Sequence, residues 1–179
     1  MLRSLFLALA LALPAAAQDA DGPPVPLAEP SMTAARLSAI LLRLDPEARP
    51  VGNGIEMTVD DLPVLVIVDA RADRMRAMVP VRGADGMSED EMLRVLQANF
   101  DSALDARYAV AQGRLWAVYI HPLAALERDQ LISGIGQAVN AARTYGTLFT
   151  GGAMQFGGGD SGDLQRRLIE DLLERGREL

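Results

Sequence analysis

Two segments of the sequence are apolar on both faces of an extended chain: residues 64–68 (VLVIV) and residues 115–120 (LWAVYI). Successive side chains of a strand point to opposite faces of its sheet, so a sheet with one face in water shows alternating apolar and polar residues instead. The two segments therefore predict a sheet whose second face is also covered. The cover would come from the chain's remaining helices, from a second copy of the chain or from a partner chain.

The order of helical and extended segments indicates the fold class. Helical periodicity begins after the capping residues Ser31 and Thr33 and stops before Asp45-Pro46, and a capping box at residues 88–91 starts a second helix. A third helix follows at about residues 127–145. The extended segments are residues 55–59, 64–68, 75–81, 107–111 and 114–120, the last two joined by a tight turn at Gln112-Gly113. This order, α-β-β-β-α-β-β-α, predicts an α+β fold with an antiparallel sheet of about five strands.

The two ends of the chain differ from this core in composition. Residues 1–17 combine one positive charge, an apolar run and small residues at Ala15 and Ala17, as is typical of a secretory signal peptide. The alternative, a membrane anchor, is disfavoured because the apolar run is too short to span a bilayer. We therefore expect cleavage after Ala17 and an exported, periplasmic protein. The remainder divides into a Pro-rich linker (18–30), an α+β domain (31–146) and a Gly-rich tail (147–179), whose short amphipathic helix at about residues 163–175 we expect to lie apart from the core.

The composition excludes several classes of function. The chain has no cysteine, which excludes disulfides, a thiol nucleophile and Cys-ligated metal sites. Its formal net charge is −7, and its basic residues are all arginine. We do not expect so acidic a chain to bind nucleic acid or an anionic membrane as a general partner. No segment after the leader reaches the length needed for membrane insertion.

Three segments carry a resemblance to a known fold family: LLRLDP at residues 41–46, MLRVLQANFDSALDARYAVAQGRLWAVYIHPL at residues 92–123 and LISGIGQAVNAARTYG at residues 131–146. With the order of elements, they resemble the type III secretion chaperone-like (Tir-chaperone-like) fold, and most of all its exported YbjN-type domains, described as bacterial sensory transduction regulators. The resemblance covers about residues 31–145. It implies a small α+β domain that dimerises, holds a protein segment on apolar sheet and helix surfaces, and catalyses no reaction. The leader and the Gly-rich tail depart from a cytoplasmic secretion chaperone and favour an envelope protein on the same scaffold.

The sequence holds few candidates for catalysis or metal binding. His121 is the only histidine, so a two-histidine metal site cannot form, and we expect a structural role for it at the end of a strand. The acidic runs Asp60-Asp61 and Glu89-Asp90-Glu91 are explained by a turn and by a helix cap. The glycines at residues 157–159 lack the lysine and the preceding strand of a phosphate-binding loop. We therefore predict no catalytic residue, no metal site and no cofactor.

Apolar residues in excess of what three helices can cover predict binding surfaces. Methionine and large aromatic side chains suit protein interfaces, and we assign partner binding to Val66, Met78, Trp116 and Val118. We assign a homodimer interface, on the second helix and the strand after it, to Phe100, Leu104, Tyr108 and Val110. The predicted function is a non-enzymatic, exported protein-binding domain, chaperone-like or regulatory. The alternative is a small-molecule-binding or hydrolytic envelope protein with a site between the sheet and the C-terminal tail, using Asp60, Asp61 or His121.

Overall fold

The structure is a computed structural model of the chain, and it describes residues 29–101, 104–146 and 163–177. The predicted signal peptide, nearly all of the predicted linker and the Gly-rich segment before the last helix lie outside the described residues.

The described residues form helices and one sheet in the predicted order, with one additional strand and the C-terminal helix. The elements are α1 (Ala34–Leu44), β1 (Arg49–Val51), β2 (Gly54–Val59), β3 (Leu62–Asp69), β4 (Arg74–Gly83), α2 (Glu89–Asp101), β5 (Arg107–Ala111), β6 (Arg114–Pro122), α3 (Arg128–Arg143) and α4 (Asp163–Gly176). The predicted α+β fold is confirmed. The additional strand, β1, is three exposed residues with Pro50 at its centre, which is too short to show a strand pattern in the sequence.

The six strands form one antiparallel sheet in the order β1-β2-β3-β4-β6-β5. The turn between β2 and β3 is Asp60-Asp61, with φ angles of 52° and 64°, and the turn between β5 and β6 is Gln112-Gly113, with φ angles of 52° and 69°. Two-residue turns with positive φ at both positions match the twist of the strands that they join. The predicted turns at these two positions are therefore confirmed.

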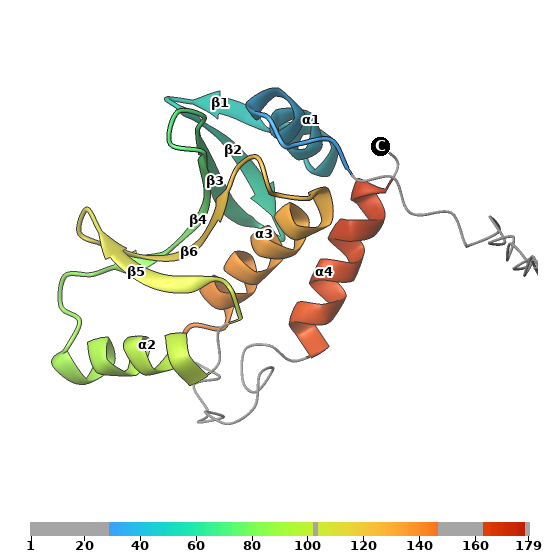
Figure 1. Ribbon diagram of the computed structural model, residues 1–179. Helices are drawn as coiled ribbons and strands as arrows, with labels where there is room; N and C mark the ends of the chain where they lie inside the picture. The colour runs from blue at the N-terminus through green and yellow to red at the C-terminus, as the bar shows by residue number, and fades with distance from the viewer. Residues whose placement is uncertain (1–28, 102–103, 147–162, 178–179) are drawn as a thin grey trace, which may run out of the picture.

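Two helices cover one face of the sheet (Figure 1). α3 crosses that face and packs against β4 and β6. α1 lies on the same side of the sheet as α3, at the end formed by β1 and β2. Every residue of α3 from Gly134 to Ala141 is buried. The close approach of α3 to the sheet depends on Gly134, because a Cβ atom there would lie 2.4 Å from the Tyr119 ring. A helix buried on all sides needs a cover on its far side as well.

That cover is the C-terminal helix α4, which packs along α3 on the side away from the sheet (Figure 1). Leu172 is fully buried, and Nδ2 of Asn140 in α3 donates a hydrogen bond to Oε1 of Gln165 in α4 at 3.3 Å. Gly136 permits the contact, since a Cβ atom there would lie 2.7 Å from Cγ1 of Ile169. Our expectation that this helix lies apart from the core is wrong: α4 is the third layer, over the sheet and α3.

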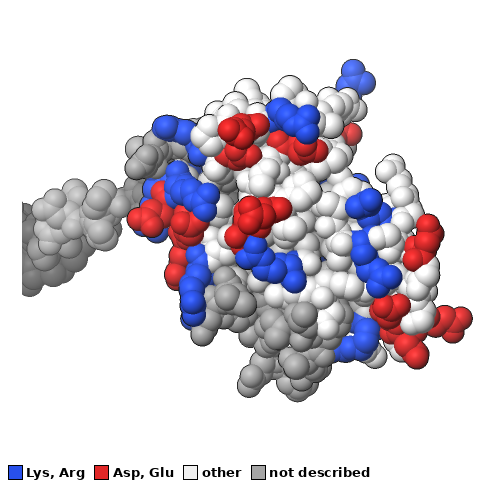
Figure 2. Space-filling view, turned by 180° about the vertical axis from the view of Figure 1, so that it is seen from behind, with Lys and Arg blue, Asp and Glu red and all other residues white. Residues whose placement is uncertain are grey.

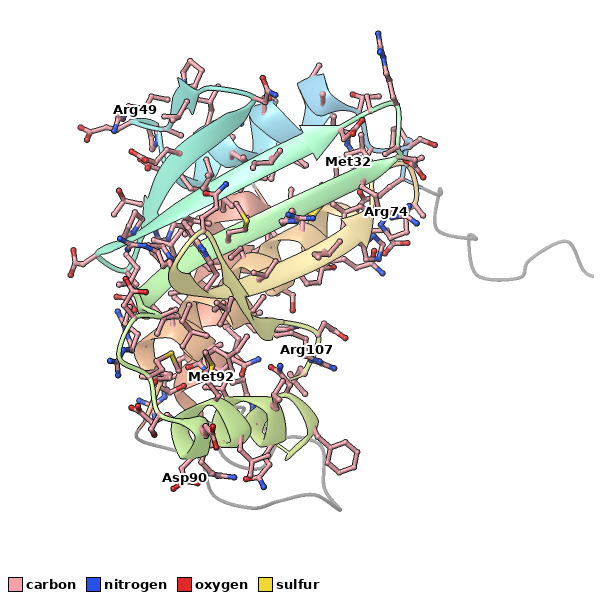
Figure 3. All side chains as sticks on the ribbon, turned by 90° about the vertical axis from the view of Figure 1, so that its left-hand side faces the viewer. Met32, Arg49, Arg74, Asp90, Met92 and Arg107 are labelled. Carbon is pink, nitrogen blue, oxygen red and sulfur yellow. The ribbon has the colours of Figure 1, made fainter. Side chains whose placement is uncertain are left out.

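α2 lies beyond the β5 edge of the sheet and covers neither face (Figures 1 and 3). Its predicted capping box is confirmed, because Ser88 and Glu91 each accept a hydrogen bond from the other's backbone N–H, at 3.2 and 2.9 Å. The Asn99 amide accepts from the N–H of Tyr108 at 2.7 Å and donates to its carbonyl oxygen at 3.1 Å. The Asn99 side chain thereby satisfies the N–H and the carbonyl oxygen of Tyr108, which lie at the outer edge of β5 and would otherwise lack a hydrogen-bond partner.

Candidate functional site

The second face of the sheet has no helix over it in the part of the chain that the structure describes, and Figure 3 looks onto this face. Strand register places Leu65, Met78 and Val118 side by side across β3, β4 and β6. None of the three belongs to the cluster of buried residues between the sheet and the helices, although Leu65 and Met78 are half-buried and Val118 is 9% exposed. The predicted cover is therefore not supplied by the described helices. We call this surface the uncovered face and define its apolar part as Leu65, Ile67, Met78, Trp116, Val118 and Ile120.

Three of the four predicted partner-binding residues share the uncovered face. Met78 and Val118 are direct register partners, and Trp116 lies two residues before Val118 on β6, which puts both on the same face. Val66 lies on the other face, opposite Ala77, and is 1% exposed in the core. It therefore contributes nothing to the uncovered face. Both faces of β3 are apolar, so the sequence alone does not distinguish Val66 from its neighbours.

The Trp116 ring is held in place by its own hairpin. Nε1 of Trp116 donates a hydrogen bond to the carbonyl oxygen of Ala111 at 3.1 Å. The guanidinium carbon of Arg114 lies 5.8 Å from the centroid of the ring, within the range of a cation–π interaction. Since the ring is already positioned, a partner that packs on it loses little additional conformational entropy.

A second apolar surface runs along the solvent side of α2. Leu93, Leu96 and Phe100 are spaced three and four residues apart, so they share one side of the helix, and their exposed fractions are 55%, 64% and 76%. Val95 and Ala98 face the opposite way and are buried. We call Leu93, Leu96 and Phe100 the α2 stripe. Large apolar side chains grouped on an exposed helix are typical of an interaction site.

The four residues predicted for the dimer interface occupy different surroundings. Phe100 belongs to the α2 stripe, Val110 is exposed on β5, and Leu104 is half-buried. Tyr108 is buried within its own chain: its hydroxyl donates a hydrogen bond to the carbonyl oxygen of Ala141 at 2.6 Å, and its ring packs edge-on against Tyr145. Tyr108 therefore stabilises the core and offers no side-chain surface to a partner.

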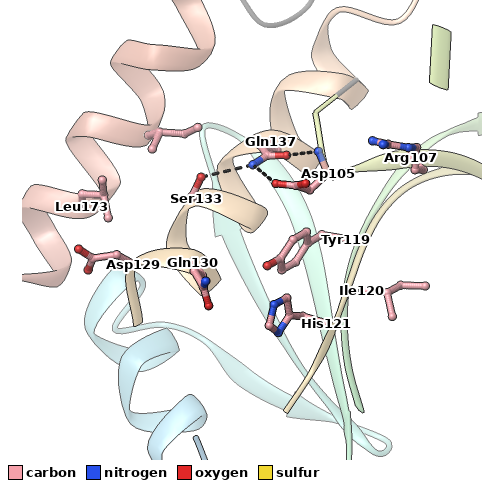
Figure 4. A pocket seen from close by; sticks show the side chains of 11 residues that line it. Asp105, Arg107, Tyr119, Ile120, His121, Asp129, Gln130, Ser133, Gln137 and Leu173 are labelled. Carbon is pink, nitrogen blue, oxygen red and sulfur yellow. Dashed lines mark hydrogen bonds between the residues drawn. The ribbon is translucent and has the colours of Figure 1, made fainter. Parts of the chain in front are cut away.

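A cleft of about 670 Å³ lies at the end of β6, between the sheet, α3 and α4 (Figure 4). Its lining includes His121, and also Asp105, Arg107, Tyr119, Asp129, Gln130, Ser133, Gln137 and Leu173. The other residues of the alternative hypothesis lie elsewhere. Asp60 forms an ion pair with Arg143 and lines a separate cleft of about 290 Å³ against α3 and α4. Asp60 and His121 therefore do not form one site.

The backbone before β5 borders the His121 cleft and is held by α3. The helix that precedes this backbone, α2, ends at Asp101. Oε1 of Gln137 instead accepts hydrogen bonds from the N–H groups of Asp105 and Ala106, at 2.8 and 3.2 Å. Nε2 of the same amide donates to Ser133 at 3.3 Å.

Among the side chains that line the cleft, Tyr119 has the pKa that departs most from its ordinary value. It is 5% exposed, and its hydroxyl makes no hydrogen bond among the described residues. Burial, and to a lesser degree the negative charge of Asp105, raises the pKa of Tyr119 to about 12. The His121 ring stacks on Tyr119 with a centroid distance of 6.0 Å, and Nδ1 of His121 lies 2.8 Å from the carbonyl oxygen of Pro122. No hydrogen bond joins His121 to Ser133 or to a carboxylate in the described ranges, so the geometry of a Ser–His–acid triad is not assembled there.

Across residues 29–101, 104–146 and 163–177, no group of three or more acidic or histidine side chains is placed to hold a metal ion. Within the same ranges, no helix is long and apolar enough to cross a membrane. Acidic and basic side chains alternate over the surface seen in Figure 2, with uncharged areas between them. Neither charge sign dominates that side of the molecule.

No family model matches the sequence, and no curated protein matches it. Several solved structures are similar to the chain, and we report three. They are the ExsC–ExsE complex (13% identity, covering 62% of this chain and 91% of that chain, TM-score 0.49), the HopA1–SchA chaperone–effector complex (12% identity, 61% and 91%, TM-score 0.46) and the Yersinia pestis type III secretion chaperone SycH with a stable fragment of YscM2 (18% identity, 60% and 97%, TM-score 0.45). Because each TM-score is below 0.5, we base the function on this chain's own surfaces.

Proposed function

We propose that this chain is a non-enzymatic protein-binding domain that holds a segment of a partner protein on the uncovered face. The observation that carries the proposal is the row Leu65, Met78 and Val118, which lies in register across three strands with Trp116 beside it. Covering apolar surface recovers roughly 25 cal/mol per Å². Tryptophan is also enriched among the residues that dominate binding energy. The proposal assigns no catalytic step to His121 or Ser133: Nδ1 of His121 lies beside the carbonyl oxygen of Pro122, and Ser133 accepts a hydrogen bond from Gln137.

We infer a homodimer from the α2 stripe. A two-fold interface brings the same patch of both copies together, so an apolar helix side can cover itself. Leu93, Leu96 and Phe100 supply such a side, and Val110 on β5 is a further exposed apolar residue. This places the dimer contact on a different element from the uncovered face, which stays available to a partner in each copy.

The composition of residues 1–17 supports export, and we propose a periplasmic location on that basis. An exported chain with this order of elements fits an envelope role of the kind ascribed to YbjN-type domains, which the sequence resembles. Intact-mass measurement of the chain recovered from the periplasmic fraction tests whether residues 1–17 are removed and the chain is exported. A mass that retains residues 1–17, found with the membranes, contradicts it.

The test of the protein-binding role is capture of partners from an envelope extract by the wild-type chain and by two charge variants. Trp116→Asp places a carboxylate on the uncovered face. Leu42→Asp makes the same kind of change at an exposed apolar residue of α1 and serves as the matched control. We expect the wild type and Leu42→Asp to retain the same protein and Trp116→Asp to lose it, with circular dichroism showing all three folded. Equal capture by Trp116→Asp contradicts the proposal.

The cleft at the end of β6 supports one other candidate, a small-molecule-binding protein. The observation in its favour is the Tyr119 hydroxyl, which has no hydrogen-bond partner among the described residues and belongs to a side chain that lines the cleft beside His121. A polar ligand would supply that partner. A screen of polar metabolites by thermal shift, with Tyr119→Phe as the control, tests this candidate. A ligand that stabilises the wild type but not Tyr119→Phe favours it.

A further inference from the structure

Arginines surround the apolar part of the uncovered face. Arg74 and Arg76 on β4 share this face with Met78, Arg114 on β6 shares it with Trp116, and Arg107 on β5 lies opposite Val118. In Figure 3, Arg74 is labelled at the end of the sheet where β4 begins, and Arg107 at the start of β5, where it also borders the cleft at the end of β6. A chain with a formal net charge of −7 thus gathers positive charge on this one surface.

These arginines are not neutralised within the described chain. Arg74 and Arg107 donate hydrogen bonds to backbone carbonyl oxygens, of Asp73 at 2.7 Å and of Ala106 at 2.9 Å, and Arg114 lies over the Trp116 ring. None of Arg74, Arg76, Arg107 and Arg114 forms an ion pair with a carboxylate in the described ranges.

The two carboxylates on the same face, Glu56 and Asp69, already interact with groups of this chain. Glu56 is paired with Arg49 on β1. Asp69 accepts hydrogen bonds from the backbone N–H groups of Arg71 and Ala72, both at 3.0 Å, in the turn that follows β3. Asp69 keeps its negative charge and is the register partner of Arg74, whereas Arg76, Arg107 and Arg114 have no carboxylate opposite them in the sheet. These three positive charges remain available to an outside group.

The charged and apolar side chains are interleaved. Arg76 stands between Ile67 and Ile120 in one cross-strand row, and the next row is Leu65, Met78 and Val118. Rows on one face are separated by two residues along the strand, or roughly 7 Å, which is also the spacing of alternate residues in an extended chain. Membrane-binding polybasic surfaces instead cluster several basic residues together.

We propose that the uncovered face binds an extended protein segment in which every second residue carries in turn a carboxylate or an apolar side chain, so that both kinds lie on the side of the segment that faces the sheet. Its carboxylates pair with Arg76 and Arg114, and its apolar side chains pack on Met78, Trp116 and Val118. This inference rests on the proposed function and specifies the chemistry of the partner. Opposite charges across an interface raise both the rate of association and the specificity of binding.

Trp116 provides the test, because it is the only tryptophan of the chain and lies on the proposed site. Three tryptophan-free peptides carry leucine or phenylalanine at every fourth residue and glutamate, glutamine or lysine two residues after each, so that both kinds of side chain lie on one side of the extended chain. Each is titrated into the full chain while Trp116 fluorescence is recorded. We expect the glutamate peptide to bind about tenfold more tightly than the glutamine peptide, with an advantage that falls as salt rises.

Two variants with the same change of charge test whether the tighter binding of the glutamate peptide depends on the uncovered face. Arg76→Glu should weaken binding of the glutamate peptide about tenfold, whereas Arg167→Glu, on exposed α4, should leave it unchanged. Equal binding of the glutamate and glutamine peptides with a Trp116 response overturns the inference and leaves the proposed function standing. Vesicles of anionic lipid that change Trp116 fluorescence more strongly than the glutamate peptide also overturn it. If no peptide changes Trp116 fluorescence, the uncovered face is not the binding site and the proposed function fails with the inference.

Discussion

Arg114 and Trp116 lie together on the uncovered face, with the guanidinium carbon 5.8 Å from the centroid of the indole ring. The hydrogen bond from Trp116 to Ala111 holds the ring against the β5–β6 hairpin. The β5–β6 hairpin thus presents a positive charge and a large apolar surface in a fixed arrangement. Both the proposed protein-binding role and the proposed chemistry of the partner depend on this arrangement.

The packing of α4 predicts a large effect of truncating Leu172. Because this side chain is fully buried, Leu172→Ala should lower the free energy of unfolding by about 2–5 kcal/mol. Glu170→Ala, at an exposed position of the same helix, should change it by less than about 0.5 kcal/mol. Urea denaturation followed by circular dichroism measures both. Equal stability of the two variants would show that α4 is not part of the core.

Gly134→Ala tests the contact between α3 and the sheet. Alanine favours a helix over glycine by about 1 kcal/mol, but its Cβ atom would lie 2.4 Å from the Tyr119 ring. The steric cost of the added Cβ atom should outweigh the gain in helix propensity, with a net loss of about 1–3 kcal/mol in the free energy of unfolding. In a double-mutant cycle, Gly134→Ala should cost less when Tyr119 is already alanine. Strictly additive effects would contradict the contact.

The raised pKa of Tyr119 predicts a loss of stability at high pH. The folded chain keeps the phenol neutral up to a pKa of about 12, whereas the unfolded value is 10.0. The contribution of Tyr119 to stability is therefore complete below pH 10.0 and is lost as the pH rises toward about 12. A titration of tyrosinate absorbance should lose one group that ionises near pH 12 in Tyr119→Phe. An unchanged titration curve in that variant would be inconsistent with a buried Tyr119.

The α2 stripe predicts that Leu96→Glu converts a dimer to a monomer. A glutamate at this position would bury a charge in the contact between two copies, whereas the side chain is already in water in the single chain. Gln97→Glu adds the same charge at the neighbouring exposed position and should leave the dimer intact. Light scattering of the two variants and the wild type decides this. A wild type that is monomeric over the whole accessible concentration range contradicts the dimer.

Local signals in the sequence were sufficient to predict most of the fold. Thr33 begins α1, and Ser88 with Glu91 begins α2, because each side chain satisfies backbone groups at a helix start. The position of α4 was not predictable in this way. Its packing depends on Gly136 and on the Asn140–Gln165 hydrogen bond, and neither the space beside a glycine nor the partner of a buried amide is visible in a single sequence.

The binding surface was predicted in part. Alternation along β6 separates Trp116 and Val118 from Ala117 and Tyr119, but apolar residues on both faces of β3 conceal which face the helices cover. Register resolved this and placed Val66 in the core. Along β4, Arg74 and Arg76 alternate with the buried Met75 and Ala77, and this alternation in the sequence distinguishes the uncovered face of the strand from its core face.

The most direct test of the uncovered face is photo-crosslinking of the chain in the cells that produce it. A photoreactive phenylalanine replaces Ile120 on the uncovered face, which is 53% exposed, or Leu96 on the α2 stripe, or Arg71 in the exposed turn after β3 as the control. The account predicts an adduct with a different protein from position 120, an adduct with a second copy of the chain from position 96, and neither from position 71. No adduct from position 120, or the same adduct from positions 120 and 71, would contradict a binding site on the uncovered face.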